Sequence, residues 1–72
     1  SFLDDIDALL EPDDLAAALD ADPTARASWD QTPASLKKRC LYDIKVAKTD
    51  KTRAKRIAKY VERCARGERP IE

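Results

Sequence analysis

The chain has no histidine, no methionine and only one glycine among its 72 residues. Histidine is the side chain that most often serves as a general base, and its absence removes the usual centre of acid–base catalysis. A single glycine cannot build a glycine-rich phosphate loop, and the two cysteines do not form a CxxC motif for zinc or redox chemistry. We therefore expect a protein that is not an enzyme and that binds no metal and no cofactor.

Long apolar runs are also missing. No stretch approaches the ~20 apolar residues of a membrane-spanning helix, and no secretion signal opens the chain. We therefore expect a cytoplasmic protein without a membrane span. The missing methionine indicates that residue 1 is not a translational start, so we expect residues 1–72 to be a single helical domain that was processed or excised from a longer chain.

The composition favours helices. Hydrophobic residues make up 43% of the chain and charged residues 39%, with many Ala, Leu, Lys, Arg and Asp. The Val, Ile, Thr and aromatic runs that are typical of strands do not occur. Helical spacing of apolar residues recurs in five segments, which are residues 2–10, 12–21, 22–31, 32–48 and 49–67. The sequence predicts an all-α fold, a compact bundle of four to five short helices.

Local signals place the ends of these helices. Asp22 and Thr32 each precede a proline and are predicted N-caps of the third and fourth segments. Thr49 or Asp50 is the predicted N-cap of the last helix, and Gly67 is its predicted left-handed C-cap. Each prediction depends on a side chain or a backbone conformation that the helix end requires.

Periodicity also predicts which residues are buried. Trp29 is the expected anchor of the core. The first segment carries Phe2, Ile6, Leu9 and Leu10 at helical spacing. The fourth segment carries Leu36, Cys40, Ile44 and Ala47 on one face, and Tyr42 and Val46 on a second apolar face. The last segment carries Ala54, Ile57, Ala58, Val61 and Ala65. The fourth helix is thus expected to be central and contacted from two sides. Cys40 and Cys64 are predicted to be buried free thiols, with an interhelical disulfide as the open alternative.

Charge is strongly polarised although the net charge is zero. Residues 1–30 hold nine acids and one base, a net −8, whereas residues 31–72 hold thirteen bases and five acids, a net +8. Such polarisation indicates either a face for a partner or two halves that fold against each other. The candidate partner-binding face comprises Lys55, Lys59, Arg63 and Arg66.

These charges first indicate the solvated side of a packed helix. If the face binds a partner, an acidic protein or peptide is the one that it would suit. Weak binding of nucleic acid or another polyanion is the alternative. It is less favoured because the domain is neutral overall, carries no aromatic residue on its basic face for base stacking, and contains a segment of charge −8.

One ordered set of motifs resembles a known family. The run "PDDLAAALDADPTARASWD", then "TP", then "AK" followed by "TRAKRIAK" and a closing glycine resembles the bacteriocin-protection, YdeI/OmpD-associated family over about residues 11–67. The resemblance implies a short helical domain, often the C-terminal part of a longer bacterial protein, without known catalytic residues. We expect an interaction or accessory module in a family linked to protection against bacteriocins or antimicrobial peptides. Thr52, Arg53 and Arg56 match the recurring "TRxxRI" positions, and we expect them to hold the last helix to the acidic half.

Overall fold

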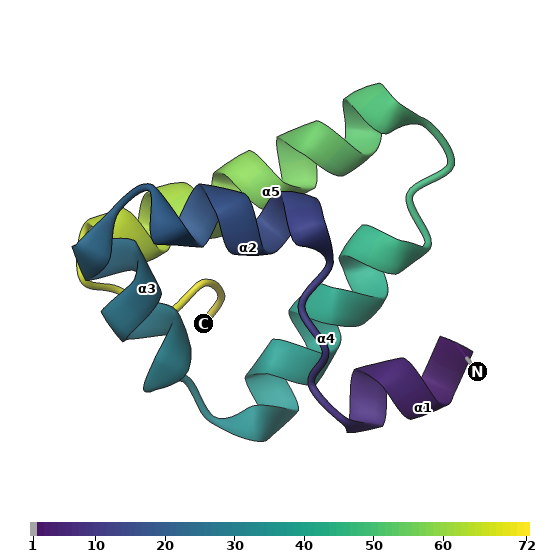
Figure 1. Cartoon of the computed structure of the whole chain (residues 1–72), viewed down its shortest axis with the longest axis horizontal. Coiled ribbons are helices and arrows are strands. Elements are labelled where there is room, and N and C mark those ends of the chain that lie inside the picture. Colours follow the sequence, from purple (N-terminus) through teal and green to yellow (C-terminus); the bar gives the residue numbers. More distant parts are fainter. Residues whose placement is uncertain (1) are drawn as a thin grey trace.

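The computed structural model describes residues 2–72, with side chains from Leu3 onward, so the predicted place of the Phe2 side chain lies outside the described part. Five α-helices form, and the described residues contain no strand (Figure 1): α1 Phe2–Asp7, α2 Asp13–Asp20, α3 Pro23–Asp30, α4 Ala34–Lys45 and α5 Asp50–Ala65. This confirms the predicted all-α bundle. None of these five helices has the length and apolar character that crossing a bilayer requires.

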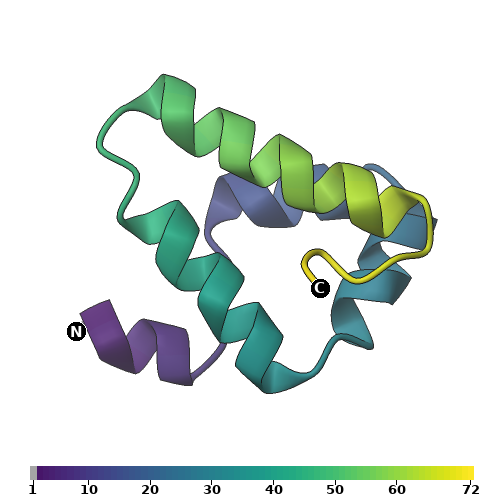
Figure 2. The ribbon, with the colours of Figure 1, turned by 180° about the vertical axis from the view of Figure 1, so that it is seen from behind.

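The longest helix, α5, organises the fold. It packs against α2, α3 and α4, whereas α1 packs against α4 (Figures 1 and 2). Helix α4 contacts α5 and α1, but it is not the central helix that the sequence predicts. Its second apolar face stays largely open, since Tyr42 is 51% exposed and Val46 is 41% exposed.

Two N-caps form as the sequence predicts. The Asp22 carboxylate accepts hydrogen bonds from the backbone N–H groups of Thr24 and Ala25, at 2.9 and 3.2 Å. Thr49, rather than Asp50, is the N-cap of α5, and its hydroxyl oxygen accepts a hydrogen bond from the N–H of Thr52 at 3.1 Å. Each cap satisfies backbone donors that the first helical turn leaves without partners.

The prediction that Thr32 caps α4 is wrong. Helix α4 begins at Ala34, so Pro33 occupies the N-cap position, where it makes no side-chain hydrogen bond. Thr32 is therefore too far from the helix and instead serves the preceding one. Its buried hydroxyl donates a hydrogen bond to the carbonyl oxygen of Ser28 at 2.7 Å, which satisfies an acceptor at the end of α3.

Helix α5 ends in a Schellman motif at Gly67, as the sequence predicts. Gly67 has a φ of 78°, its N–H donates to the carbonyl oxygen of Cys64 at 2.9 Å, and the N–H of Glu68 donates to that of Arg63 at 3.1 Å. This turn directs residues 68–72 back along the molecule (Figure 2).

Helix α1 ends in the same way, although no glycine is present. Leu9 has a φ of 57°, and its N–H donates to the carbonyl oxygen of Ile6 at 2.9 Å. The N–H of Leu10 donates to the backbone carbonyl oxygen of Asp5 at 3.0 Å. The helix therefore ends at Asp7 and not at Leu10. A leucine in this conformation costs about 1–2 kcal/mol and gives no sequence signal, which explains why the end was not predicted.

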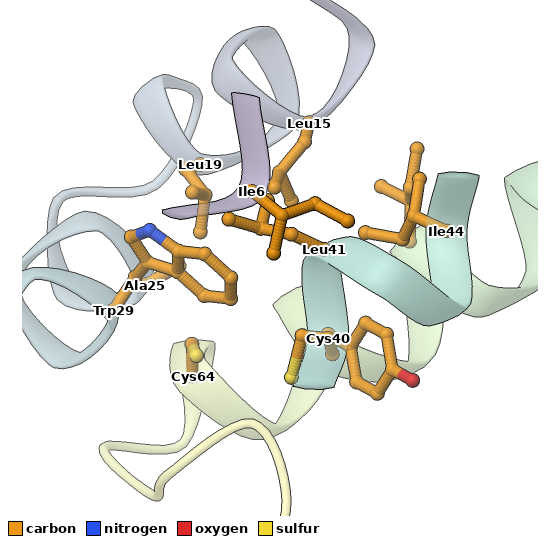
Figure 3. Packing of buried hydrophobic residues seen from close by; sticks show 11 residues of the cluster. Ile6, Leu15, Leu19, Ala25, Trp29, Cys40, Leu41, Ile44 and Cys64 are labelled. Carbon is orange, nitrogen blue, oxygen red and sulfur yellow. The ribbon is translucent and has the colours of Figure 1, made fainter. Parts of the chain in front are cut away.

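The core lies where the helices meet (Figure 3). Its buried residues are Ile6, Leu15, Leu19, Ala25, Trp29, Cys40, Leu41, Ile44, Ile57, Tyr60 and Cys64. Trp29 is 2% exposed, as expected of its central anchor. Partly buried Leu9, Ala18, Val61, Ala65 and Ile71 pack around this cluster.

The buried side of α5 agrees with the predicted one at Ile57, Val61 and Ala65 but differs at other positions. Ile57, Tyr60 and Cys64 are buried, whereas Ala54 and Ala58 are exposed. The helix is therefore turned toward its larger side chains, because burying a tyrosine ring removes more apolar surface from water than burying alanine methyl groups. Periodicity found the helix but did not weigh the sizes of its side chains.

Ion pairs join the acidic and basic halves. One pair links α2 to α5 and two link α1 to α4; these are Asp14–Arg53 at 2.7 Å, Asp5–Lys45 at 3.1 Å and Asp7–Lys38 at 3.8 Å. Part of the charge polarisation therefore serves the contact between the two halves. Within the acidic half, Arg26 alone pairs with three acids, Glu11, Asp20 and Asp30.

Candidate interaction surface

Arg53 connects α5 to the acidic half. Its Nε and Nη2 atoms donate hydrogen bonds to the two carboxylate oxygens of Asp14 on α2, at 2.7 and 3.0 Å. This bidentate contact is the geometry that a guanidinium favours with a carboxylate. The hydrogen bond from Arg53 is the main reason that the pKa of Asp14 lies below its ordinary value of 3.8. Arg53 therefore holds the helix where the sequence predicts.

Arg56 holds α5 to α4 instead of to the acidic half, which corrects the expectation for this residue. Its Nη1 donates to the carbonyl oxygen of Asp43 at 2.6 Å and lies 3.4 Å from the Asp43 carboxylate. The buried hydroxyl of Tyr60 donates to the same carboxylate. Burial and this hydrogen bond together raise the pKa of Tyr60. Asp43 thus binds two residues of α5 at once.

Thr52, the third residue of the "TRxxRI" motif, lies half-buried in the first turn of α5. Its N–H is satisfied by the N-cap, and its hydroxyl oxygen accepts a hydrogen bond from the hydroxyl of Thr49 at 3.1 Å. The two threonines stabilise the beginning of the helix together.

Arg63 and Arg66 contact the chain that follows α5. The Nε of Arg63 donates to the carbonyl oxygen of Arg69 at 2.9 Å, and its Nη2 lies 3.5 Å from Glu68. Arg66 lies 2.9 Å from the other carboxylate oxygen of Glu68 and 3.3 Å from Glu62. Two of the four residues of the candidate face are therefore bound within the chain.

Lys55 and Lys59 remain exposed. Within residues 2–72, no carboxylate lies within ion-pair distance of either ammonium group. The Nζ of Lys59 lies 5.2 Å from the centroid of the Tyr60 ring, a cation–π distance. These two lysines are the part of the candidate face that stays open to a partner.

Lys59 also borders an open groove of about 600 Å³ between α4 and α5, which α1 and the C-terminal residues help to line. Ile6, Tyr42 and Ile71 contribute apolar surface to the groove. Arg39 of α4 lines it as well, is exposed, and has no carboxylate within ion-pair distance in the described part of the chain. We call this feature the α4–α5 groove.

Of the residues that line this groove, only Lys59 belongs to the partner-binding face that the sequence predicted. Arg39 and Tyr42 are three residues apart on one helix and therefore lie on neighbouring parts of its surface. This spacing was the sequence pattern that could have predicted that the two side chains line the same groove. Ile71 gave no signal, because it reaches the groove only through the turn at Gly67. The long-range pairing of α4 with α5 decides which residues meet here.

The two cysteines are free and buried, which confirms the prediction of buried free thiols. Burial raises the pKa of Cys40 to about 12 and also raises that of Cys64. Both thiols are therefore protonated at neutral pH and are poor nucleophiles and poor metal ligands. In the part of the chain that the structure describes, no group of three or more His, Cys, Asp or Glu residues is placed to hold a metal ion.

Comparison with known protein families shows a match over most of the chain. Residues 8–67 match the family described as bacteriocin-protection, YdeI or OmpD-associated. The match includes α2 to α5 and Gly67 but neither α1 nor residues 68–72, although both of these segments line the α4–α5 groove. No curated protein and no solved structure matches the chain significantly.

Proposed function

Because the chain belongs to the bacteriocin-protection, YdeI or OmpD-associated family, we propose that it is a non-enzymatic accessory module of a bacterial protein that binds an acidic protein or peptide. One observation carries the proposal: Arg39 and Lys59 border the same groove, and no acid in residues 2–72 pairs with either. In bacteriocin or antimicrobial-peptide protection, the domain would contribute by binding its partner and not by chemistry.

The state of the nucleophilic groups supports a role without catalysis. Catalytic thiols and phenols are usually activated by a lowered pKa or by a neighbouring base. In this chain the pKa values of Cys40, Cys64 and Tyr60 are all raised, chiefly by burial. Tyr60 also uses its proton in a hydrogen bond to Asp43, which stabilises the fold.

Affinity capture from a bacterial lysate tests this proposal. We expect the wild-type chain to retain an acidic protein that the Lys59→Glu variant loses. Lys51→Glu is the matched control, because it makes the same charge change on α5 two helical turns from Lys59, and it should retain the protein. If a folded Lys59→Glu variant keeps every partner of the wild type, the proposal is wrong.

Polyanion binding is the second candidate function, and one observation favours it. Lys51, Lys55 and Lys59 are exposed at intervals of four residues along α5 and form a basic stripe. The stripe is small, because the arginines of α5 are engaged within the chain. Three phosphate contacts would give a slope of about −2.7 in a plot of log affinity against log salt concentration. Titration with random duplex DNA measures this slope, and lack of binding at low salt would exclude the function.

A further inference from the structure

Helix α1 shows how the surface of α4 holds an acidic segment. Ile6 is 6% exposed and packs into the core, while the acids on either side of it in the sequence contact lysines of α4. Asp5 lies 3.1 Å from the Nζ of Lys45, and Asp7 lies 3.8 Å from that of Lys38. An isolated helix of six residues is not stable in water, so α1 depends on these contacts for its position.

The adjoining part of the α4–α5 groove also combines cations with apolar surface. No acidic segment of the described residues lies against these cations. Arg39 and Lys59 supply two cations, and Tyr42 and Ile71 supply apolar surface. Two acids also line this groove, but both are engaged. Asp7 pairs with Lys38, and the Asp43 carboxylate is bound by Arg56 and Tyr60.

We propose that the α4–α5 groove binds an acidic segment of a partner protein in which one large apolar side chain stands between two acids. The partner's carboxylates would contact Arg39 and Lys59, and its apolar side chain would pack on Tyr42 and Ile71. The groove is open and has a volume of about 600 Å³, so a segment could lie along it from the surface. This inference rests on the proposed function and adds to it the pattern that the partner presents.

Charge complementarity selects this occupant. A wholly apolar segment would leave the two cations without partners, and a polyanion without apolar groups would leave Tyr42, which is 51% exposed, and Ile71 uncovered. A segment with both features covers the apolar surface and neutralises the rim, the arrangement that gives protein interfaces an apolar centre and a charged edge.

A peptide of residues 2–11, FLDDIDALLE, is a suitable probe because it carries the Asp-Ile-Asp pattern that α4 already accommodates. The peptide, labelled with fluorescein, is titrated with the full chain at low ionic strength, and anisotropy is recorded. We expect saturable binding that Arg39→Glu and Lys59→Glu each weaken at least about tenfold. Tyr42→Ser should weaken it about fivefold, since it removes apolar contact. Lys51→Glu is the control and should change the affinity less than about twofold.

Two altered peptides separate this inference from the proposed function. One carries serine in place of Ile6, and the other carries asparagine in place of Asp5 and Asp7; we expect both to bind at least about tenfold more weakly. If the serine peptide binds as well as the original and Tyr42→Ser has no effect, charge alone is recognised. The groove inference then fails while the proposed function stands. If neither these peptides nor polyglutamate binds, and the capture experiment finds no partner sensitive to Lys59→Glu, both fail.

Two further results would overturn the inference. Nitrogen-15 NMR of the chain should show peptide-induced shifts at Arg39, Tyr42, Lys59 and Ile71. Shifts confined to Lys38 and Lys45 would mean that the peptide merely replaces α1. Sedimentation of the chain alone should show a monomer; a dimer that Lys59→Glu dissociates would mean that a second copy of the chain occupies the groove.

Discussion

The arginines and the lysines of α5 carry the same charge but have different surroundings. Arg53, Arg56 and Arg63 flank the buried side of the helix and are half-buried, and Arg66 lies near its end. Each of the four forms an ion pair within the chain. The lysines, in contrast, lie on the exposed side; they are Lys51, Lys55 and Lys59, and none pairs with a carboxylate in residues 2–72.

The chemistry of the two side chains explains this division. A guanidinium presents five donors in a planar fork, so it can bind a carboxylate and a carbonyl oxygen together, as Arg56 does with Asp43. A lysine ammonium is compact and strongly hydrated and keeps its water when it is exposed. The arginine side of α5 therefore stabilises the fold, and the lysine side is available to a partner.

Among the substitutions that test this division, removal of the Asp43 side chain should lower the free energy of unfolding the most. Asp43→Ala leaves the buried Tyr60 hydroxyl without its acceptor and Arg56 with only the carbonyl oxygen of residue 43. An unsatisfied buried donor costs about 1–3 kcal/mol, so we expect the free energy of unfolding to fall by about 2 kcal/mol. Urea denaturation followed by circular dichroism measures the loss.

Glu62→Ala is the control for this variant. Glu62 also pairs with an arginine of α5, but the pair is exposed and joins residues four apart on the same helix. Solvent screens such a pair, so we expect Glu62→Ala to lower the free energy of unfolding far less than Asp43→Ala does. If the two variants lose the same stability, the burial of Tyr60, which Asp43 binds, is not what distinguishes them, and the arginine side does not stabilise the fold as described.

Gly67→Ala should have the next largest effect, because it changes the turn that brings the C-terminal residues back to Arg63 and Arg66. No atom lies within 4 Å of an added Cβ, so the cost comes from the φ of 78° alone. A residue with a side chain in this conformation costs about 1–2 kcal/mol, and we expect a loss of about 1 kcal/mol. Gly67→Asn, which tolerates this conformation better, should lose less in the same urea denaturation. Equal losses would mean that strain at this φ is not the cause.

Much of the fold could be predicted because its signals are local. Asp22 and Gly67 each act within a few residues, and the structure has them as predicted. The prediction that Thr32 caps α4 was wrong because Pro33 occupies the N-cap position. The end of α1 was not predicted because Leu9 adopts a conformation that glycine usually provides. The burial of Tyr60 on α5 was not predicted for another reason. It depends on a hydrogen bond to Asp43, which lies on another helix.

Arg53→Gln should have a smaller, pH-dependent effect. The folded-state pKa of Asp14 lies below 3.8, so the pair's stabilisation is fully present above pH 3.8 and disappears as pH falls through that lowered value. Asp14 is about half exposed, so solvent screening limits the loss at pH 7 to about 0.5–1 kcal/mol. In urea denaturation, the difference between variant and wild type should shrink as pH falls below 3.8 and vanish once Asp14 is protonated in the folded state. In an Asp14→Asn background, Arg53→Gln should change stability little at any pH, and a persistent loss would assign the effect to packing.

The candidate site was less predictable than the fold. The periodicity of α5 indicates that Lys55 and Lys59 are exposed, because they lie opposite its apolar residues. The capture of Arg63 and Arg66 by Glu68 and the chain beyond it depends on the direction of the turn at Gly67, which a helix projection does not contain. Sequence patterns therefore identified a basic helix but not which of its charges remain open.

Lys55→Ala should have the smallest effect and is the most direct test of the comparison. Lys55 forms no ion pair in the described part of the chain, and alanine has the highest helix propensity, so the free energy of unfolding should change by less than about 0.5 kcal/mol. Lys55 does not line the α4–α5 groove, whereas Lys59 does. The acidic peptide should therefore bind Lys55→Ala nearly as tightly as the wild type, and Lys59→Ala more weakly, although both variants keep their stability. A loss of more than about 1 kcal/mol in Lys55→Ala would show that the lysine side also stabilises the fold. The distinction between the two sides of α5 would then be lost.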